Sequence, residues 1–410
     1  MKYPSIKEFY LNQIQNDFFP YWIKFIDNEK GGILNCINNY GDKKISDNKF
    51  TWSQGRWLWI LCCLYKLVKK NVLPKLNAAQ IENWAEKTWR FISTYCIMDD
   101  TSCCYLLTRD GVKIKDDNTG RFDASIYADC FALIGIAQYA QTFENEQACK
   151  TAQVLYKSIK TRIESHNFLT EPYPIPDGYK IHGIPMILVN TIHEYTSMLQ
   201  TFNMPVSDEI EFGKKNALFI VEKLMCADGY IREFLCSDKK DGLLDRHINP
   251  GHTIEDLWFL LEFFQKIGCT EKYLAQICKT AKRTWHLGWD KEYGGLLRFV
   301  DYTGGKPQGT SYGSPYENLI LNTWDMKLWW PHSETLFTFI LLYKLTGDSE
   351  FKEIYETSSD YIFKTFPNKE LGEWIQIRSR NGLPEEKLVA LPVKDPFHIL
   401  RNYIKITELL

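Results

Sequence analysis

The sequence lacks several features that would place it at once in a large class. Residues 1–27 contain no unbroken apolar stretch of the kind an export signal needs. The longest apolar run, residues 57–65, is far shorter than the roughly 20 residues that span a membrane. The 49 Lys and Arg nearly balance the 51 Asp and Glu, so the totals give no support to a polyanion-binding surface. We therefore expect a cytoplasmic protein that binds neither nucleic acid nor membrane.

Motifs for bound cofactors are also missing. The twelve cysteines include no Cys-x-x-Cys pair, and without an export signal we expect reduced, mostly buried thiols. No GxxxxGK[ST] motif occurs, and Gly304-Gly-Lys306 is too short a match to predict a nucleotide site. The sequence thus calls for no cofactor.

Aromatic residues, in contrast, are plentiful: 13 Trp, 23 Tyr and 24 Phe make up 15% of 410 residues. Such a content suits a large core or a groove that stacks against sugar-like ligands.

A repeat runs through the whole chain. Short extended segments recur at intervals of 62 to 78 residues, with amphipathic helical patterns between them. They lie at residues 31–36, 104–109, 167–170, 229–234, 294–299 and 372–377.

A polar residue follows each extended segment near a predicted helix start, 21 to 23 residues later in five units and 35 in the fifth. These residues are Arg56, Tyr127, Asn190, His252, His332 and His398. Six successive hairpins with one polar residue at the same phase predict an all-α fold, an (α/α)6 barrel with short β segments at its rim. Because no linker interrupts the pattern, we expect a single catalytic domain over residues 1–410.

Three of only eight histidines fall on this ring, and histidine exchanges protons near neutral pH. Glu255 lies about one helical turn beyond His252 and is expected to orient it. A metal site of His247, His252 and Glu255 is an alternative that sequence spacing does not fix, and we predict none. A guanidinium packed among aromatic residues, as expected at Arg56, presents a planar set of N–H donors to substrate oxygens.

Several motifs carry a resemblance to a known family. They are Lys49-Phe-Thr-Trp-Ser-Gln-Gly-Arg56, Pro250-Gly-His-Thr-Ile-Glu255, Trp324-Asp-Met-Lys-Leu-Trp-Trp-Pro-His332-Ser-Glu334, Gly372-Glu-Trp374 and Phe397-His-Ile-Leu-Arg401. In this order, from about Gly31 to Arg401, they are similar to those of the N-acylglucosamine 2-epimerase family. Pro185-Met-Ile-Leu-Val-Asn190 resembles the same branch.

The resemblance implies an (α/α)6 barrel, often a homodimer, in which His252 and His398 form an acid/base pair and Arg56 binds substrate oxygens. Enolisation of an open-chain sugar would then invert carbon 2. We expect the remaining site residues to shape the sugar pocket: Tyr127, Asn190, Trp330, His332, Trp374 and Arg401.

The substrate is less sharply defined than the chemistry. Pro331-His332 follows the N-acylglucosamine branch, which favours N-acetylglucosamine and N-acetylmannosamine and a place in sialic acid metabolism. Leu400 departs from that branch, which tends to have Pro there. Cellobiose 2-epimerases and mannose isomerases run the same chemistry and stay open as alternatives, as does ATP as an allosteric effector. An (α/α)6 glycoside hydrolase would need an acidic residue at the mouth, and a non-catalytic protease-binding protein would not need the histidines.

Overall fold

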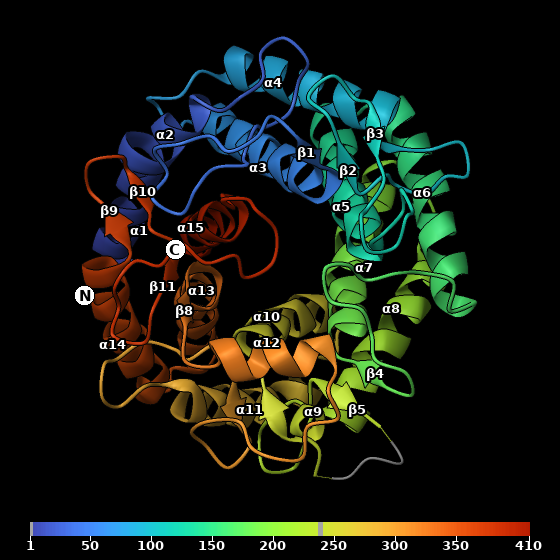
Figure 1. Cartoon of the computed structure of the whole chain (residues 1–410). Helices are drawn as coiled ribbons and strands as arrows, with labels where there is room; N and C mark the ends of the chain where they lie inside the picture. Colours follow the sequence, from blue (N-terminus) through green and yellow to red (C-terminus); the bar gives the residue numbers. More distant parts are fainter. Residues whose placement is uncertain (1–2, 237–240) are drawn as a thin grey trace.

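The chain forms a closed ring of helical hairpins (Figure 1). A computed structural model describes residues 3–236 and 241–410. The inner helices contact one another in sequence order, and the last contacts the first, so the ring closes. They are α3 (Thr51–Lys69), α5 (Ile126–Phe143), α7 (Gly183–Thr201), α10 (Pro250–Lys266), α13 (Trp329–Thr346) and α15 (Phe397–Leu409). The predicted (α/α)6 barrel is confirmed.

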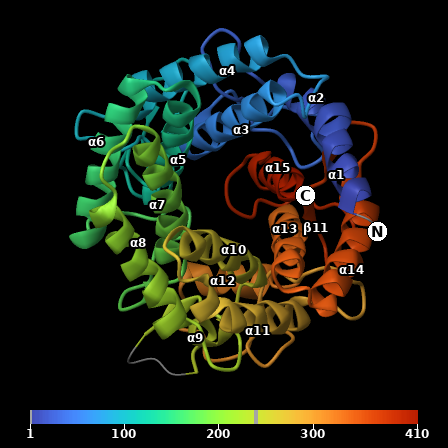
Figure 2. The same ribbon diagram turned by 180° about the vertical axis from the view of Figure 1, so that it is seen from behind.

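An outer layer of helices surrounds this ring, which Figure 2 shows from behind. It consists of α1 (Tyr3–Asn12), α4 (Ala78–Phe91), α6 (Glu146–Glu164), α8 (Ser207–Phe219), α11 (Thr270–Gly288) and α14 (Ser349–Thr365). A π-helical turn, η1 (Gln13–Phe18), continues α1 into α2 (Phe19–Ile23), and similar turns end α4 (η2, Ile92–Cys96) and α8 (η3, Ile220–Leu224).

The two layers differ in sequence pattern because they differ in exposure. In α5 every residue from 128 to 140 is buried, as expected of a helix covered on all sides. In α11 the buried residues include Tyr273, Ile277, Ala281 and Trp285, spaced four apart, which gives one apolar face and one solvated face. All twelve cysteines are free and eight are buried, as predicted.

The tightest helix contact joins the first two hairpins. A Cβ atom added at Gly55 of α3 would lie 2.2 Å from the Phe131 carbonyl oxygen, and one added at Gly135 of α5 would lie 2.2 Å from the Gly55 oxygen. Glycine is required at both positions because the backbones touch there.

Short antiparallel strand pairs decorate one rim of the ring, where the inner helices begin. They are β1 (Lys49–Phe50), β2 (Leu106–Leu107) and β3 (Lys113–Ile114) in one sheet, then β4 (Lys180–Ile181) with β5 (Phe234–Leu235), β6 (His247–Ile248) with β7 (Val300–Asp301), β8 (Lys327–Leu328) with β11 (Ile377–Arg378), and β9 (Pro367–Asn368) with β10 (Glu373–Trp374). Two short helices, α9 (Leu243–Arg246) and α12 (Pro315–Thr323), complete this rim.

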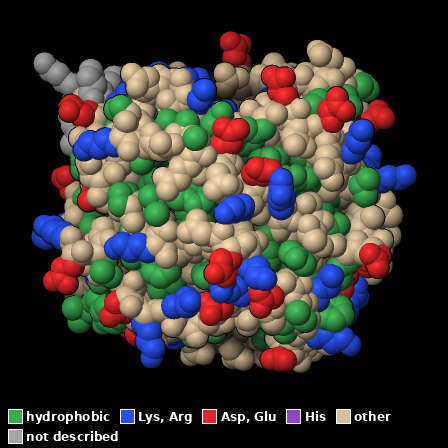
Figure 3. Space-filling model, turned by 90° about the horizontal axis from the view of Figure 1, so that it is seen from above, with side chains coloured by type: hydrophobic (Ala, Val, Ile, Leu, Met, Phe, Trp, Pro, Cys, Tyr) green, Lys and Arg blue, Asp and Glu red, His purple; other side chains and the backbone are tan. Residues whose placement is uncertain are grey.

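The outer wall mixes charges of both signs. On the face seen in Figure 3, Lys and Arg alternate with Asp and Glu, and neither sign gathers into a patch. Within the described ranges, none of the helices combines the length and apolarity that crossing a membrane would require.

Candidate active site

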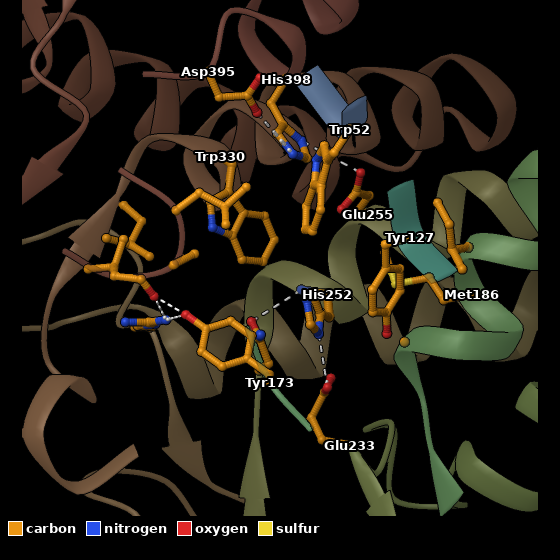
Figure 4. Close-up of a pocket in the computed structure, with 18 of the residues that line it drawn as sticks. Trp52, Tyr127, Tyr173, Met186, Glu233, His252, Glu255, Trp330, Asp395 and His398 are labelled. Atoms are coloured by element: carbon orange, nitrogen blue, oxygen red, sulfur yellow. Dashed lines mark hydrogen bonds and ion pairs between the residues drawn. The ribbon is translucent and has the colours of Figure 1, made fainter. Parts of the chain in front are cut away.

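A cavity of about 230 Å³ opens at the mouth of the ring (Figure 4). All six inner helices contribute side chains to its wall, and because each helix begins at this rim, their partially positive N-terminal ends lie around it. The lining residues from these helices include Trp52, Arg56, Tyr127, Phe131, Met186, His252, Glu255, Trp330 and His398.

His252 is the third residue of α10, and its position follows from the local sequence. Asn249 caps the helix by accepting a hydrogen bond from the His252 backbone N–H at 3.2 Å. The imidazole Nδ1–H donates to Oε2 of Glu233 at 2.9 Å, because a carboxylate can only accept. Nε2 is therefore the unprotonated nitrogen of the neutral ring, and the His252 side chain reaches the cavity.

Glu233 is buried, and burial alone would raise its pKa. The imidazoles of His252 and His182 outweigh this effect and hold the pKa of the Glu233 carboxyl well below its ordinary value. The partner of His252 is thus a permanent carboxylate at neutral pH.

His398 is built in the same way on the opposite wall. It is the second residue of α15, and its Nδ1–H donates to Oε1 of Glu334 at 2.7 Å. Glu334 is also held by Arg401, whose charge, together with the hydrogen bonds that Glu334 accepts, lowers its pKa against the effect of burial. Nε2 of His398 points to the cavity side, 3.7 Å from Oδ2 of Asp395.

Trp330 lies against both imidazoles. Its ring centroid is 5.3 Å from that of His252 and 5.7 Å from that of His398, so the two imidazole centroids lie no more than about 11 Å apart. Figure 4 shows all three rings around one cavity. Two imidazoles, side chains able to exchange protons near neutral pH, therefore face a shared space from separate helices.

Arg56 forms the third element of the site. It is nearly buried, its Nη1 donates to Oδ2 of Asp395 at 2.8 Å, and its guanidinium lies 3.9 Å from the Phe131 ring centroid. Burial lowers the pKa of Arg56 to about 10, which still leaves it charged at neutral pH. Its Nε has no hydrogen-bond partner among the described residues. That nitrogen is itself buried, but Arg56 lines the cavity, where its guanidinium can meet a substrate oxygen.

The predicted role of Glu255 as the partner of His252 is wrong. Glu255 is hydrogen-bonded to Arg401 and lies 3.6 Å from Nδ1 of His398, whereas Glu233 holds His252. One helical turn places Glu255 on the same side of α10, but its carboxylate turns toward α15, where the Arg401 guanidinium attracts it.

Four further predicted pocket residues lie outside the lining of the cavity. Asn190 is the eighth residue of α7, two turns below the mouth, and is buried. Trp374 is buried against Phe366, with ring centroids 5.4 Å apart. Arg401 is buried in its contacts with Glu255 and Glu334, behind His398 rather than facing the cavity.

The fourth, His332, is buried in contacts with the backbone. Its Nε2 accepts a hydrogen bond from the Leu296 N–H at 2.8 Å, and its Nδ1–H donates to the Leu328 oxygen at 2.6 Å. Burial lowers the pKa of His332 to about 3, so the ring is neutral. Its predicted contact with the sugar is replaced by a structural role.

Tyr127 and Trp330 do line the cavity, as do Arg56, His252, Glu255 and His398. Their roles in catalysis and binding stay predictions.

The alternative metal site of His247, His252 and Glu255 does not form, because the three side chains have separate partners. His247 donates through Nδ1 to the Leu244 oxygen, and His252 and Glu255 have different partners. Two other groups have liganding atoms within 4.8 Å of one another: His182, Glu233 and His252, and Glu255, Glu334 and His398. Because His182 and Arg401 already balance their carboxylates, we assign a metal to neither.

Sequence reasoning missed several groups that the fold brings to the site. Glu233 sits in the extended segment 229–234, and Glu334 ends the Trp-Trp-Pro-His-Ser-Glu motif, but no spacing rule links either to its histidine. Asp395 had a signal, since it stands three residues before His398. Tyr173 comes from a loop far from any helix start and covers the cavity, where Arg298 donates to its hydroxyl oxygen at 3.3 Å.

Comparison with known proteins agrees with this geometry. The family model for N-acylglucosamine 2-epimerase (GlcNAc 2-epimerase) matches residues 213–401, which include both cavity histidines. The N-acylglucosamine 2-epimerase of Bos taurus is 28% identical over 390 residues, covering 94% of this chain and 86% of the relative. The chain is therefore similar to the N-acylglucosamine 2-epimerases over nearly its whole length.

Other relatives support both family and fold. The N-acylglucosamine 2-epimerase of Homo sapiens is 27% identical over 391 residues, covering 94% of this chain and 85% of the relative. The solved structure of cellobiose 2-epimerase from Bacillus thermoamylovorans B4167 superposes with a TM-score of 0.78 at 17% identity, covering 99% of this chain and 100% of that one. At that identity the superposition concerns the fold alone.

Proposed function

We propose that this chain is a member of the N-acylglucosamine 2-epimerase family and interconverts N-acetyl-D-glucosamine and N-acetyl-D-mannosamine by moving a proton at carbon 2. The observation that carries the proposal is the matched pair of imidazoles at one cavity. Each has its Nδ1–H on a buried carboxylate and its Nε2 on the cavity side, with Trp330 against both rings.

Epimerisation at carbon 2 needs two bases. The ring of the sugar must first open, because only the free carbonyl makes the neighbouring proton acidic. One base then removes that proton from one face, and the conjugate acid of the other returns a proton to the opposite face. His252 of α10 and His398 of α15, facing one cavity from separate helices, meet this requirement.

Arg56 would stabilise the negative oxygen of the enolate between the two proton transfers. A guanidinium held by one carboxylate and stacked on aromatic rings is preorganised for this task, and the N-terminal ends of the inner helices add partial positive charge around the mouth. Trp330 offers an indole face to the C–H face of the sugar, and Tyr127 forms part of the cavity wall.

The names of the relatives favour the N-acyl sugar as substrate. Four mammalian relatives that are 26–28% identical to this chain are named N-acylglucosamine 2-epimerase, whereas the relative named cellobiose 2-epimerase, from Eubacterium cellulosolvens, is 22% identical. Met186, Ile187 and Val389 give the cavity an apolar stretch that suits the methyl group of an N-acetyl substituent.

The test is incubation in deuterated water with four sugars in parallel: N-acetylmannosamine, N-acetylglucosamine, mannose and cellobiose. Proton NMR should show deuterium entering carbon 2 fastest in the N-acetyl sugars, together with appearance of the other epimer. Deuterium at carbon 1 with formation of a ketose would identify an aldose–ketose isomerase, and faster exchange in cellobiose would overturn the assignment of substrate.

Finer assignments belong to the same proposal. The family resemblance supports a cytoplasmic homodimer that acts in sialic acid metabolism, and ATP as an effector rather than a reactant. Sedimentation velocity, with and without ATP, measures the oligomeric state directly.

A further inference from the structure

A chain of buried side chains extends behind His252, away from the cavity. It begins where β4 pairs with β5 in antiparallel register, Ile181 opposite Phe234. The next residue on each side continues the contact, since the His182 backbone N–H donates to the Glu233 oxygen at 2.9 Å. The strand pair thus fixes His182 and Glu233 as neighbours.

Their side chains are joined as well. Nδ1 of His182 lies 3.2 Å from Oε1 of Glu233, and Nε2 lies 2.8 Å from Oδ2 of Asp256, a residue of α10. As ionised carboxylates both partners only accept, so both ring nitrogens then donate and the ring is an imidazolium. Burial raises the pKa of Asp256, and the positive charge of His182 acts against that rise. Burial would lower the pKa of His182, but Asp256 and Glu233 outweigh it and raise the pKa to about 10. Neither His182 nor Asp256 lines the cavity, and both are fully buried.

We propose that His182 is a positively charged positioning residue that acts on His252 through Glu233, and that Asp256 keeps it charged. The inference rests on the proposed function, in which His252 is one of the two bases.

The two oxygens of Glu233 explain how this control works. Oε1 is held by His182, which leaves Oε2 to accept from Nδ1 of His252. A buried carboxylate without its cation would take up a proton and could then donate to Nδ1. His252 would switch tautomer, carry its proton on Nε2, and lose the ability to accept one from the sugar.

The other base has the same arrangement with a different cation. Glu334, the partner of His398, is held by Arg401, whose charge is permanent at any pH that leaves the protein folded. The two bases are therefore supported unequally, because only the cation behind His252 can lose its proton.

Other titratable groups surround this chain without supplying the charge. Burial raises the pKa of Tyr127 and of Tyr316 and lowers that of His247 to about 4, so all three are neutral near pH 7. Glu255, next to Asp256 on α10, is paired with Arg401. His182 is thus the positive group that meets Glu233 from behind.

The protonation state can be measured without turnover. In the intact protein with ¹⁵N-labelled histidine, we expect His182 to have both nitrogens protonated at pH 8, where an ordinary histidine is neutral. Asp256→Asn should convert it to the neutral form at that pH. A neutral His182 ring in the wild type at pH 8 would overturn the proposal.

The effect on His252 is tested by kinetics. His182→Gln should lower kcat about 10- to 100-fold with little change in KM. In deuterated water it should slow exchange at carbon 2 only for the epimer that His252 deprotonates, and leave exchange of the other epimer at the wild-type rate. On a Glu233→Gln background, His182→Gln should have no further effect, because its path of action is already cut.

A matched control is His193→Gln, which replaces a histidine in the middle of α7, away from the mouth. Equal slowing of both epimers by His182→Gln, or additive effects with Glu233→Gln, would mean that His182 only supports the fold. If the wild type exchanged no sugar at all, the proposed function would fail, while the nitrogen spectra would still decide the charge of His182.

Discussion

The guanidinium of Arg56 and the carboxylate of Asp395 lie 2.8 Å apart, although 339 positions separate them in the sequence. The ion pair joins the first inner helix to the segment that precedes α15, across the seam where the ring closes. It holds the Arg56 side chain in place at the wall of the cavity, where the guanidinium can meet a substrate oxygen.

Replacement of this arginine tests its proposed role. Arg56→Lys keeps the charge but loses the planar fork, and we expect kcat to fall about 10²- to 10³-fold, the usual effect of removing one donor to a developing oxyanion. Steady-state kinetics measure the loss, and Arg90→Lys, at an exposed position on α4, is the control. An unchanged kcat would remove Arg56 from the stabilisation of the enolate.

Both histidines should be needed for epimerisation, but each should deprotonate a different epimer of the sugar. His252→Ala and His398→Ala should each reduce epimerisation by at least about 10³-fold while far-ultraviolet circular dichroism stays that of the wild type. Each variant keeps one base, so each should still exchange deuterium into one epimer without forming the other. Exchange into both epimers in either variant contradicts a two-base mechanism.

His332 should matter for stability rather than for binding. His332→Gln loses a hydrogen bond that buried backbone groups need, which we expect to cost about 1–3 kcal/mol of the free energy of unfolding. Denaturant titration measures the cost. A large rise in KM with unchanged stability would instead restore the predicted contact with the sugar.

The same histidine makes the wild type sensitive to acid. Its pKa is lowered to about 3 in the folded protein, so between about pH 6.5 and 3 the unfolded chain binds a proton that the folded one does not. Its contribution to stability is present above pH 6.5 and is lost as the pH falls through that range. The stability of His332→Gln should therefore decline less on acidification from pH 7 to 5, as thermal melts can show.

Packing of the first two hairpins should tolerate no side chain at their contact. Gly135→Ala would place a Cβ 2.2 Å from the Gly55 oxygen and should cost at least about 2 kcal/mol of unfolding free energy. Gly120→Ala is the control, since its Cβ meets nothing within 4 Å and only the positive φ of that residue opposes it. Equal stabilities of the two variants would show that α3 and α5 can separate at little cost.

The fold could be predicted because its repeat follows from short sequence patterns that are visible without the structure. Extended segments, four of the six beginning with glycine, and helical periodicities recur along the chain, and each element depends on residues within a few turns of it. The phase of the polar residues was predicted less well. Tyr127, His252 and His398 are the second or third residues of their helices, but Arg56 is the sixth and Asn190 the eighth. Equal intervals in the sequence did not place these residues at equal positions along their helices, because the loops between each extended segment and the following helix differ in length.

The partners of the catalytic groups could not be predicted in the same way. Glu255 was chosen for His252 because both lie on one helix, and helical spacing is visible in a sequence. Glu233, just before β5, reaches His252 on α10, and Glu334 on α13 reaches His398 on α15. Such contacts depend on how the hairpins are placed around the ring, and the spacing of residues along the sequence does not determine that placement.

The backbone contact between Gly55 and Gly135 has a consequence for how a ligand enters. With no side chains between them, α3 and α5 cannot slide or tilt against each other, and the wall that carries Arg56 and Tyr127 moves as one body. We therefore expect ligand exchange to depend on the loops that carry Tyr173 and Val389, which also line the cavity. Movement of these two loops would then control entry and departure of the sugar. The rigid wall of α3 and α5 would keep the sugar in one position relative to His252 and His398.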